Sequence, residues 1–287
     1  RAIMILGDSF MEGYGVNRGE LVADRLEQKG LRVVNAGVKS YSPLLEYLYL
    51  KKRGLALRPD TVILFFDLSD PSNDDYYCRR LVRDESGLPE SIRPRRLAFP
   101  EPQSGLFAWL DRHSALYNYL SHLAYKYFPA SNEDAGYSGC ASAYDLLFPG
   151  RDAIPDTAYY PRWDTALANV KLIRNLLRDS GVDFILVSYP YGHEVDTDAW
   201  REGRKGHQFP SGISSDRPFR FLERWAAAES IPIISLDRAF KEYPDPELLY
   251  FTWDGHWTPL GHELAAEEVY LRLVPERRRS DKRRDSM

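Results

Sequence analysis

Near the start of the chain, residues 3–13 run Ile3-Met4-Ile5-Leu6-Gly7-Asp8-Ser9-Phe10-Met11-Glu12-Gly13. Four consecutive apolar residues predict a buried strand, and Gly7 ends that strand just before Ser9. In an open parallel sheet, ligands bind outside the carboxyl ends of the strands. Ser9 is therefore a candidate nucleophile. The simpler alternative is that Ser9 caps the helix that follows it.

A serine hydroxyl becomes a good nucleophile only when a base takes its proton and a third group orients that base. Both groups occur in the stretch Trp253-Asp254-Gly255-His256-Trp257, near the other end of the chain. A loop can fold the Asp254 carboxylate onto one imidazole nitrogen of His256 and leave the other nitrogen facing outward. Together with Ser9, this pair predicts a Ser-His-Asp triad and favours the nucleophile over the cap.

Three blocks of the sequence resemble the SGNH (GDSL-type) hydrolases. These blocks are Gly7-Asp8-Ser9-Phe10, Asn35-Ala36-Gly37-Val38 and Asp254-x-His256-Trp257-x-x-x-Gly261. The resemblance spans most of the chain, apart from a long unmatched middle stretch. It implies a flavodoxin-like α/β fold, with three layers (α/β/α) and a mainly parallel five-stranded sheet of order 2-1-3-4-5. The last block is most similar to polysaccharide O-acetyl esterase and acetyltransferase-like members.

Strands that alternate with helical patterns independently predict a parallel, doubly wound sheet. We expect a single domain over residues 1–275, a long irregular insertion at about 76–161, and a charged tail at 276–287. The expected strands are 3–6, 31–35, 61–66, 182–189 and 231–236. The expected helices are 20–29, 43–55, 104–128, 163 to about 180, 219–230 and 258–273, with surface loops at 130–161 and 203–218.

The loop after the third strand carries the main departure from the family pattern. Where the resemblance implies Gly-x-Asn-Asp, this chain has Asp67-Leu68-Ser69-Asp70. The resemblance implies that backbone N–H groups of Ser9 and Gly37 meet the oxyanion, with the Ser69 hydroxyl or the Asn73 amide as a third donor. An ordinary acidic turn is the alternative for this loop. Its spacing does not fit a calcium-binding EF-hand, so we expect no metal.

Composition excludes several other classes of function. The 38 basic and 42 acidic residues leave a net charge of −4 with no nucleic-acid signature, and no apolar run is long enough to span a bilayer. Cys78 and Cys140 could form one disulfide or remain two buried thiols. His193 is interpreted as a surface histidine, or else a substrate contact. The chain begins at Arg1, so we expect a missing upstream segment, with an exported or periplasmic location as one possibility.

These observations together predict a serine esterase that cleaves short acyl esters, chiefly acetyl, on a carbohydrate or lipid, without a cofactor. An O-acyltransferase that moves an acetyl group to a polysaccharide hydroxyl is the first alternative, and an inactive carbohydrate-binding relative is the second. The sequence contains no G-x-S-x-G elbow and no G-x-G-x-x-G or Walker motif, so a larger α/β-hydrolase and a nucleotide site are not supported. The oligomeric state stays open.

Overall fold

The computed structural model describes residues 2–93, 109–110, 113–114, 116–117, 163–206 and 216–274. Most of the expected helix at 104–128, the loop at 130–161, Cys140 and the tail at 276–287 lie outside these residues. Among the described helices, none combines the length and the apolar character needed to cross a bilayer.

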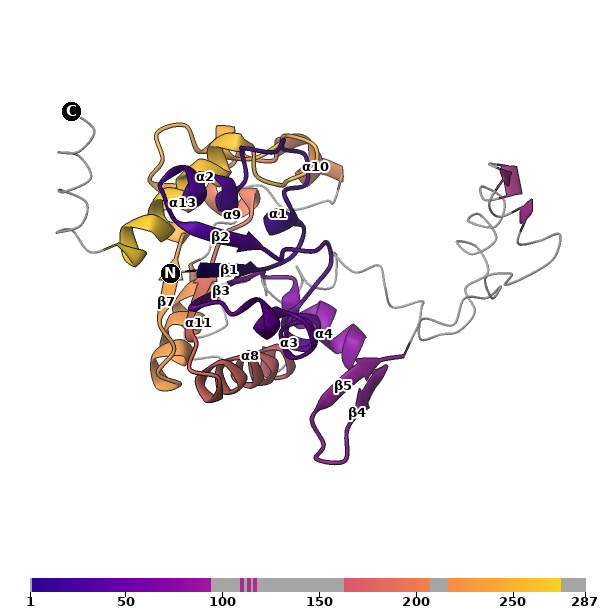
Figure 1. Cartoon of the computed structure of the whole chain (residues 1–287). Helices are drawn as coiled ribbons and strands as arrows, with labels where there is room; N and C mark the ends of the chain where they lie inside the picture. The colour runs from indigo at the N-terminus through magenta and orange to yellow at the C-terminus, as the bar shows by residue number, and fades with distance from the viewer. Residues whose placement is uncertain are drawn as a thin grey trace.

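A parallel five-stranded sheet forms the centre of the protein (Figure 1). Its spatial order is β2-β1-β3-β6-β7, which confirms the expected order. The strands are β1 (Ala2–Leu6), β2 (Arg32–Asn35), β3 (Thr61–Phe66), β6 (Asp183–Ser188) and β7 (Ile233–Ser235). In register, Ile5 of β1 lies opposite Asn35 on one side and Ile63 on the other. The loops after β1, β2 and β3 therefore emerge at one edge of the sheet.

Helices cover both faces of this sheet and complete the three layers (Figure 1). One face is covered by α2 (Val22–Gln28), α12 (Asp237–Lys241) and α13 (Pro259–Leu273). The other is covered by α3 (Pro43–Lys52), α8 (Trp163–Asp179) and α11 (Arg217–Ala228). Shorter helical segments are α1 (Ser9–Glu12), η1 (Gly54–Leu57), α4 (Asp70–Cys78), α9 (Gly192–Val195), α10 (Arg201–Gly206) and η2 (Pro246–Leu249).

The alternation of side chains along β1 explains why the strand needs both layers. Met4 and Leu6 pack into the cluster beneath α3, α8 and α11, whereas Ile3 and Ile5 pack into the cluster beneath α2 and α13. All four side chains are buried. A strand that is buried on both faces has a continuous apolar sequence, as expected for a parallel sheet.

Two segments are more regular than the sequence indicated. The irregular insertion expected from Tyr76 begins with the last turn of α4 and an antiparallel hairpin of β4 (Leu81–Arg83) and β5 (Pro89–Ile92). The Asp84 carboxylate closes this hairpin by accepting the N–H groups of Ser86 and Leu88. The loop expected from Gly203 begins inside α10. Strands and helices this short carry too little hydrophobic periodicity to be recognised.

One buried carboxylate joins three helices on the α3 face. Asp74 of α4 accepts the Ser42 hydroxyl at 2.5 Å and the Leu44 N–H at 3.0 Å, both at the start of α3. Its second oxygen accepts the Asn169 amide of α8 at 2.8 Å. Ser42 holds the N-cap position of α3, but its hydroxyl donates to Asp74 and makes no cap hydrogen bond. Cys78, in the same helix, is a half-buried free thiol.

We expect Asp74→Asn to lower the free energy of unfolding by about 1–3 kcal/mol. The new amide would still accept from Ser42 and Leu44, but its NH₂ group would face the NH₂ group of Asn169 and leave a buried donor unpaired. Urea denaturation at pH 7, followed by tryptophan fluorescence, measures the difference. Equal midpoints for the variant and the unaltered protein would contradict the role of Asp74 in joining these helices.

Candidate active site

Ser9 is the first residue of the short helix α1, directly after the turn that leaves β1. The cap of this helix is Asp8, whose carboxylate accepts the Phe10 N–H at 2.9 Å. The capping role considered for Ser9 therefore belongs to its neighbour. The Ser9 hydroxyl instead lies 2.8 Å from Nε2 of His256.

The turn between η2 and α13 carries Asp254 and His256. Backbone hydrogen bonds close it, from Phe251 N–H to His256 O at 2.9 Å and from Gly255 N–H to Phe251 O at 3.2 Å. Gly255 has a φ of +84°, a left-handed conformation that favours glycine. This backbone directs the Asp254 carboxylate back onto Nδ1 of His256, where the two groups form a hydrogen bond.

Aromatic side chains hold the imidazole in place. The His256 ring packs against Phe10 of α1 at a centroid distance of 4.7 Å and against Tyr14 at 4.9 Å. Trp257, the next residue, is fully buried and packs against Phe10 and Tyr189. The ring of His256 is therefore held by one residue of α1 and one just after it.

The geometry assigns the hydrogens along this set of three groups. An ionised carboxylate only accepts hydrogen bonds, so Nδ1 of His256 carries the hydrogen that is donated to Asp254. Nε2 is then the acceptor and faces the hydroxyl of Ser9. Such an arrangement can take a proton from the serine oxygen and hold the resulting imidazolium beside a carboxylate.

The loop after β2 touches α1 at the backbone of Gly37. A Cβ added to Gly37 would lie 2.5 Å from the carbonyl carbon of Met11 and 2.6 Å from the nitrogen of Glu12. Asn35 ties the same loop to α1, because its amide donates to Met11 O at 2.6 Å and its carbonyl accepts the Gly37 N–H at 3.0 Å. The Gly37 N–H is thus already engaged by Asn35 in the ligand-free protein.

The loop after β3 brings the two candidates for a third oxyanion donor into contact with each other. The Asn73 amide donates to the Ser69 hydroxyl oxygen at 3.1 Å. Because that oxygen accepts from Asn73, the hydroxyl hydrogen of Ser69 stays available for another acceptor. The backbone N–H of Ser69 donates to Asp67 Oδ1 at 2.6 Å and is not available.

Comparison with known proteins agrees with this architecture. Residues 145–284 match the family described as the SGNH hydrolase-like domain of the acetyltransferase AlgX. This match confirms the predicted resemblance to the SGNH hydrolases over that part of the chain, which includes the Asp254–His256 turn. No curated protein sequence matches the chain.

Several solved structures are similar to this chain at low identity. A protein from Desulfitobacterium hafniense, classed with the G-D-S-L family of lipolytic proteins, is 15% identical with a TM-score of 0.48, over 93% of this chain and 97% of the other. The acetyl xylan esterase AlAXEase is 13% identical with a TM-score of 0.47, over 96% and 100%. A lipase/acylhydrolase from Enterococcus faecalis is 16% identical with a TM-score of 0.44, over 94% and 93%. Such values carry no information on substrate.

A cluster of buried carboxyl groups lies beside Ser9. Burial raises the pKa of Asp8, Glu46 and Asp70 well above the usual values, and neighbouring carboxylates raise it further. For Asp8, the neighbour that does so is Asp67. These acids are therefore neutral at pH values where exposed ones are ionised. No set of three or more His, Cys, Asp or Glu side chains in the described residues could hold a metal ion.

Two tyrosines that the sequence did not single out connect this cluster. The Tyr189 hydroxyl lies 2.8 Å from Asp67 Oδ2 and 3.3 Å from Asp8 Oδ1, and the Tyr191 hydroxyl lies 2.6 Å from Asp67 Oδ1. The sequence could have indicated them by their position, because both follow β6 directly, at the same edge of the sheet as Ser9. The interpretation of His193 as a surface residue was wrong, because His193 is buried in α9.

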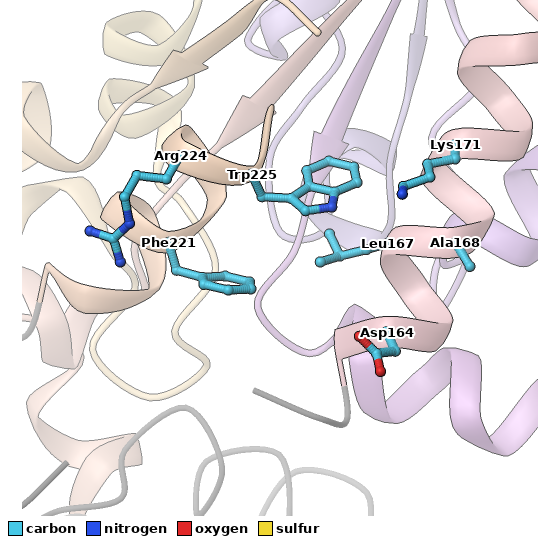
Figure 2. Close-up of a pocket in the computed structure, with 7 residues that line it drawn as sticks. All are labelled: Asp164, Leu167, Ala168, Lys171, Phe221, Arg224 and Trp225. Carbon is cyan, nitrogen blue, oxygen red and sulfur yellow. The ribbon is translucent and has the colours of Figure 1, made fainter. Parts of the chain in front are cut away.

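A hollow of about 600 Å³ lies between α8 and α11 (Figure 2). Figure 2 shows the indole of Trp225 facing Leu167, with Phe221 beside them. The hollow is lined by Asp164, Leu167, Ala168, Lys171, Phe221, Arg224 and Trp225. None of these belongs to the Ser9–His256–Asp254 set, so the hollow is separate from the candidate active site.

We expect His262 of α13 to make the protein less stable in acid. Burial lowers the pKa of His262 from 6.5 to about 4, with a smaller contribution from His256. Because the pKa of His262 is lower in the folded protein than in the unfolded chain, protonation of His262 favours unfolding. The free energy of unfolding is therefore undiminished by His262 above pH 6.5 and decreases as the pH falls towards 4. The loss amounts to about 3 kcal/mol.

Urea denaturation at several pH values between 7 and 4, on the unaltered protein and on His262→Gln, tests this expectation. Asp74, whose pKa is raised by burial to about 6, acts in the opposite direction over part of this range. The difference between the two proteins isolates His262, because Asp74 is common to both. Parallel stability curves would show that His262 does not cause the acid sensitivity.

Proposed function

We propose that this protein is a serine esterase that cleaves short acyl esters, chiefly acetyl, carried by a carbohydrate or a lipid. The observation that carries the proposal is the 2.8 Å contact between Ser9 Oγ and His256 Nε2, with Asp254 bound to the opposite ring nitrogen. A nucleophile, a base and an orienting acid within hydrogen-bond reach are the groups that acyl transfer needs.

In the proposed mechanism, Ser9 Oγ attacks the ester carbonyl carbon while His256 Nε2 takes the hydroxyl proton. Asp254 keeps the proton on Nδ1 and stabilises the imidazolium. When the tetrahedral intermediate collapses, the bond to the alcohol oxygen breaks and Nε2 returns the proton to that oxygen. Water, deprotonated by the same imidazole, then attacks the acyl carbon of acyl-Ser9. The bond to Ser9 Oγ breaks, Nε2 returns the proton to Oγ, and the acid is released.

Three groups are proposed to stabilise the negative oxygen of the intermediate. They are the backbone N–H groups of Ser9 and Gly37 and the hydroxyl of Ser69. The first N–H groups of a helix lack intrahelical partners, which supports a role for Ser9 at the start of α1. The Gly37 N–H would have to leave its hydrogen bond with Asn35 to take part. Asn73 would orient the Ser69 hydroxyl through its amide.

An O-acyltransferase is the second candidate, and the match to a domain of the acetyltransferase AlgX favours it. Both activities share the acyl-Ser9 intermediate and differ only in the acceptor, which is water in one and a sugar hydroxyl in the other. The protein should be incubated with an acetylated polysaccharide and an unacetylated acceptor, and free acetate compared with transferred acetate. Transfer above the hydrolytic background would favour the acyltransferase.

We expect Ser9→Ala and His256→Ala each to reduce kcat for p-nitrophenyl acetate by about 10⁴–10⁶-fold, since triad members act as a unit. Release of nitrophenolate at saturating ester measures this. Ser180→Ala is the matched control, because Ser180 also bears a hydroxyl but lies between α8 and β6, at the opposite edge of the sheet. Turnover that survives Ser9→Ala undiminished would rule out Ser9 as the nucleophile.

The Ser69 hydroxyl can be separated from Asn73 by a variant cycle. Loss of an oxyanion donor typically costs about 10²–10³-fold in kcat, so we expect that loss for Ser69→Ala. Asn73→Ala should cost less, and the double variant should equal Ser69→Ala alone, because Asn73 acts only through Ser69. Ser69→Asn should retain activity. A larger loss for Asn73→Ala than for Ser69→Ala would make Asn73 the donor instead.

A further inference from the structure

Asp67 is a fully buried carboxylate directly after β3. It lies between two segments, the turn of residues 7–9 (the nucleophile turn) and the loop of residues 67–69 (the Ser69 loop). It accepts three hydrogen bonds. Oδ1 accepts the Ser69 N–H and the Tyr191 hydroxyl, each at 2.6 Å, and Oδ2 accepts the Tyr189 hydroxyl at 2.8 Å. Three donors can satisfy a buried carboxylate without a cation.

The same Tyr189 hydroxyl reaches the nucleophile turn. It lies 3.3 Å from Asp8 Oδ1, the oxygen that accepts the Phe10 N–H. A continuous series of hydrogen bonds thus connects the first turn of α1 with the Ser69 loop. It runs from the Phe10 N–H through Asp8, Tyr189 and Asp67 to the Ser69 N–H.

The Tyr189 hydroxyl faces both carboxyl groups, at 2.8 Å from Asp67 Oδ2 and 3.3 Å from Asp8 Oδ1. Burial, followed by the charge of Asp67, raises the pKa of Asp8, although the hydrogen bonds from the Phe10 N–H and the Tyr189 hydroxyl act in the opposite direction. The other acids facing this pair are Glu46 of α3 and Asp70 of α4.

We propose that Asp67 is a positioning residue. Through Asp8, Tyr189 and Tyr191 it fixes the position of the nucleophile turn relative to the Ser69 loop. This inference rests on the proposed function, whose site it organises. Asp67 itself does not touch the substrate. Its carboxylate accepts from three donors of the protein, which offset its negative charge beside the proposed oxyanion site.

A purely structural carboxylate in the same protein provides a matched control. Asp74 is also buried and also accepts three hydrogen bonds, from Ser42, Leu44 and Asn169. Its partners join helices on the α3 face and include none of the proposed reacting groups. Replacing either aspartate by asparagine keeps the size of the side chain and removes its charge.

The test compares Asp67→Asn with Asp74→Asn in p-nitrophenyl acetate hydrolysis and thermal unfolding. We expect both variants to lower Tm, but only Asp67→Asn to lower kcat, by about 10–100-fold with KM changed less than threefold, because a misplaced nucleophile affects the reaction more than binding. Asp74→Asn should keep kcat within twofold.

Tyr189→Phe and Tyr191→Phe provide a second test if Asp67→Asn does not fold. We expect each to lower kcat by about 3–30-fold. Each removes one hydroxyl group that donates to Asp67, so the nucleophile turn and the Ser69 loop are held less firmly relative to each other. Tyr250→Phe is their control, since the buried Tyr250 hydroxyl donates to Pro190 O at 2.7 Å, outside this series.

The outcomes separate this inference from the proposed function. Loss of turnover in Ser9→Ala together with unchanged kcat in Asp67→Asn or in both tyrosine variants would overturn the inference alone. Equal losses of kcat in Asp67→Asn and Asp74→Asn would also overturn it, because they would reflect general destabilisation. An unaltered protein without Ser9-dependent turnover would overturn the proposed function and this inference with it.

Discussion

The parallel pairing of β1 with β3 is the constraint on which the rest of the structure depends. Leu6 pairs with Leu64, so both strands leave the sheet at the same edge, about 4.8 Å apart. Asp8 and Ser9 follow one strand, and Asp67 and Ser69 follow the other. Polar groups from two loops are thereby brought together beneath Phe10 and Trp257. Because Asp8 and Asp67 are buried there, each of these carboxyl groups needs partners from the protein.

The carboxyl groups at this edge act as a hydrogen-bonding framework more than as a collection of charges. Asp8, Glu46 and Asp70 are driven towards the neutral form by burial, whereas Asp67 is surrounded by donors. A neutral acid both donates and accepts, which suits a crowded site where backbone N–H groups and tyrosine hydroxyls compete for acceptors. An apolar replacement of Asp67 would leave three of these donors unpaired.

Much of this arrangement could be predicted from local patterns in the sequence. The predicted strand Thr61–Phe66 matches β3 residue for residue. A strand that is buried on both faces is apolar throughout, so the change to polar residues marks where it ends. Ser9, Asp254 and His256 were recognisable because a glycine turn and a short Asp-x-His spacing limit where their side chains can go. The order of the strands followed from the family resemblance.

The remaining features depend on contacts between distant residues. Tyr189 and Tyr191 contact Asp67 across 122 and 124 residues, and an aromatic residue at a strand end carries no sign of what its hydroxyl meets. His193 follows a proline and a glycine-containing turn, which is typical of surface loops, yet α9 folds back into the core. The β4–β5 hairpin is too short for its strands to show alternation.

The contact between Ser9 and His256 spans 247 residues, nearly the whole chain. The ribosome therefore adds His256 long after Ser9. Until the turn that precedes α13 has emerged and docked against α1, Ser9 lacks the imidazole that the proposed mechanism requires. A truncated product that ends before this turn would carry Ser9 without its proposed base.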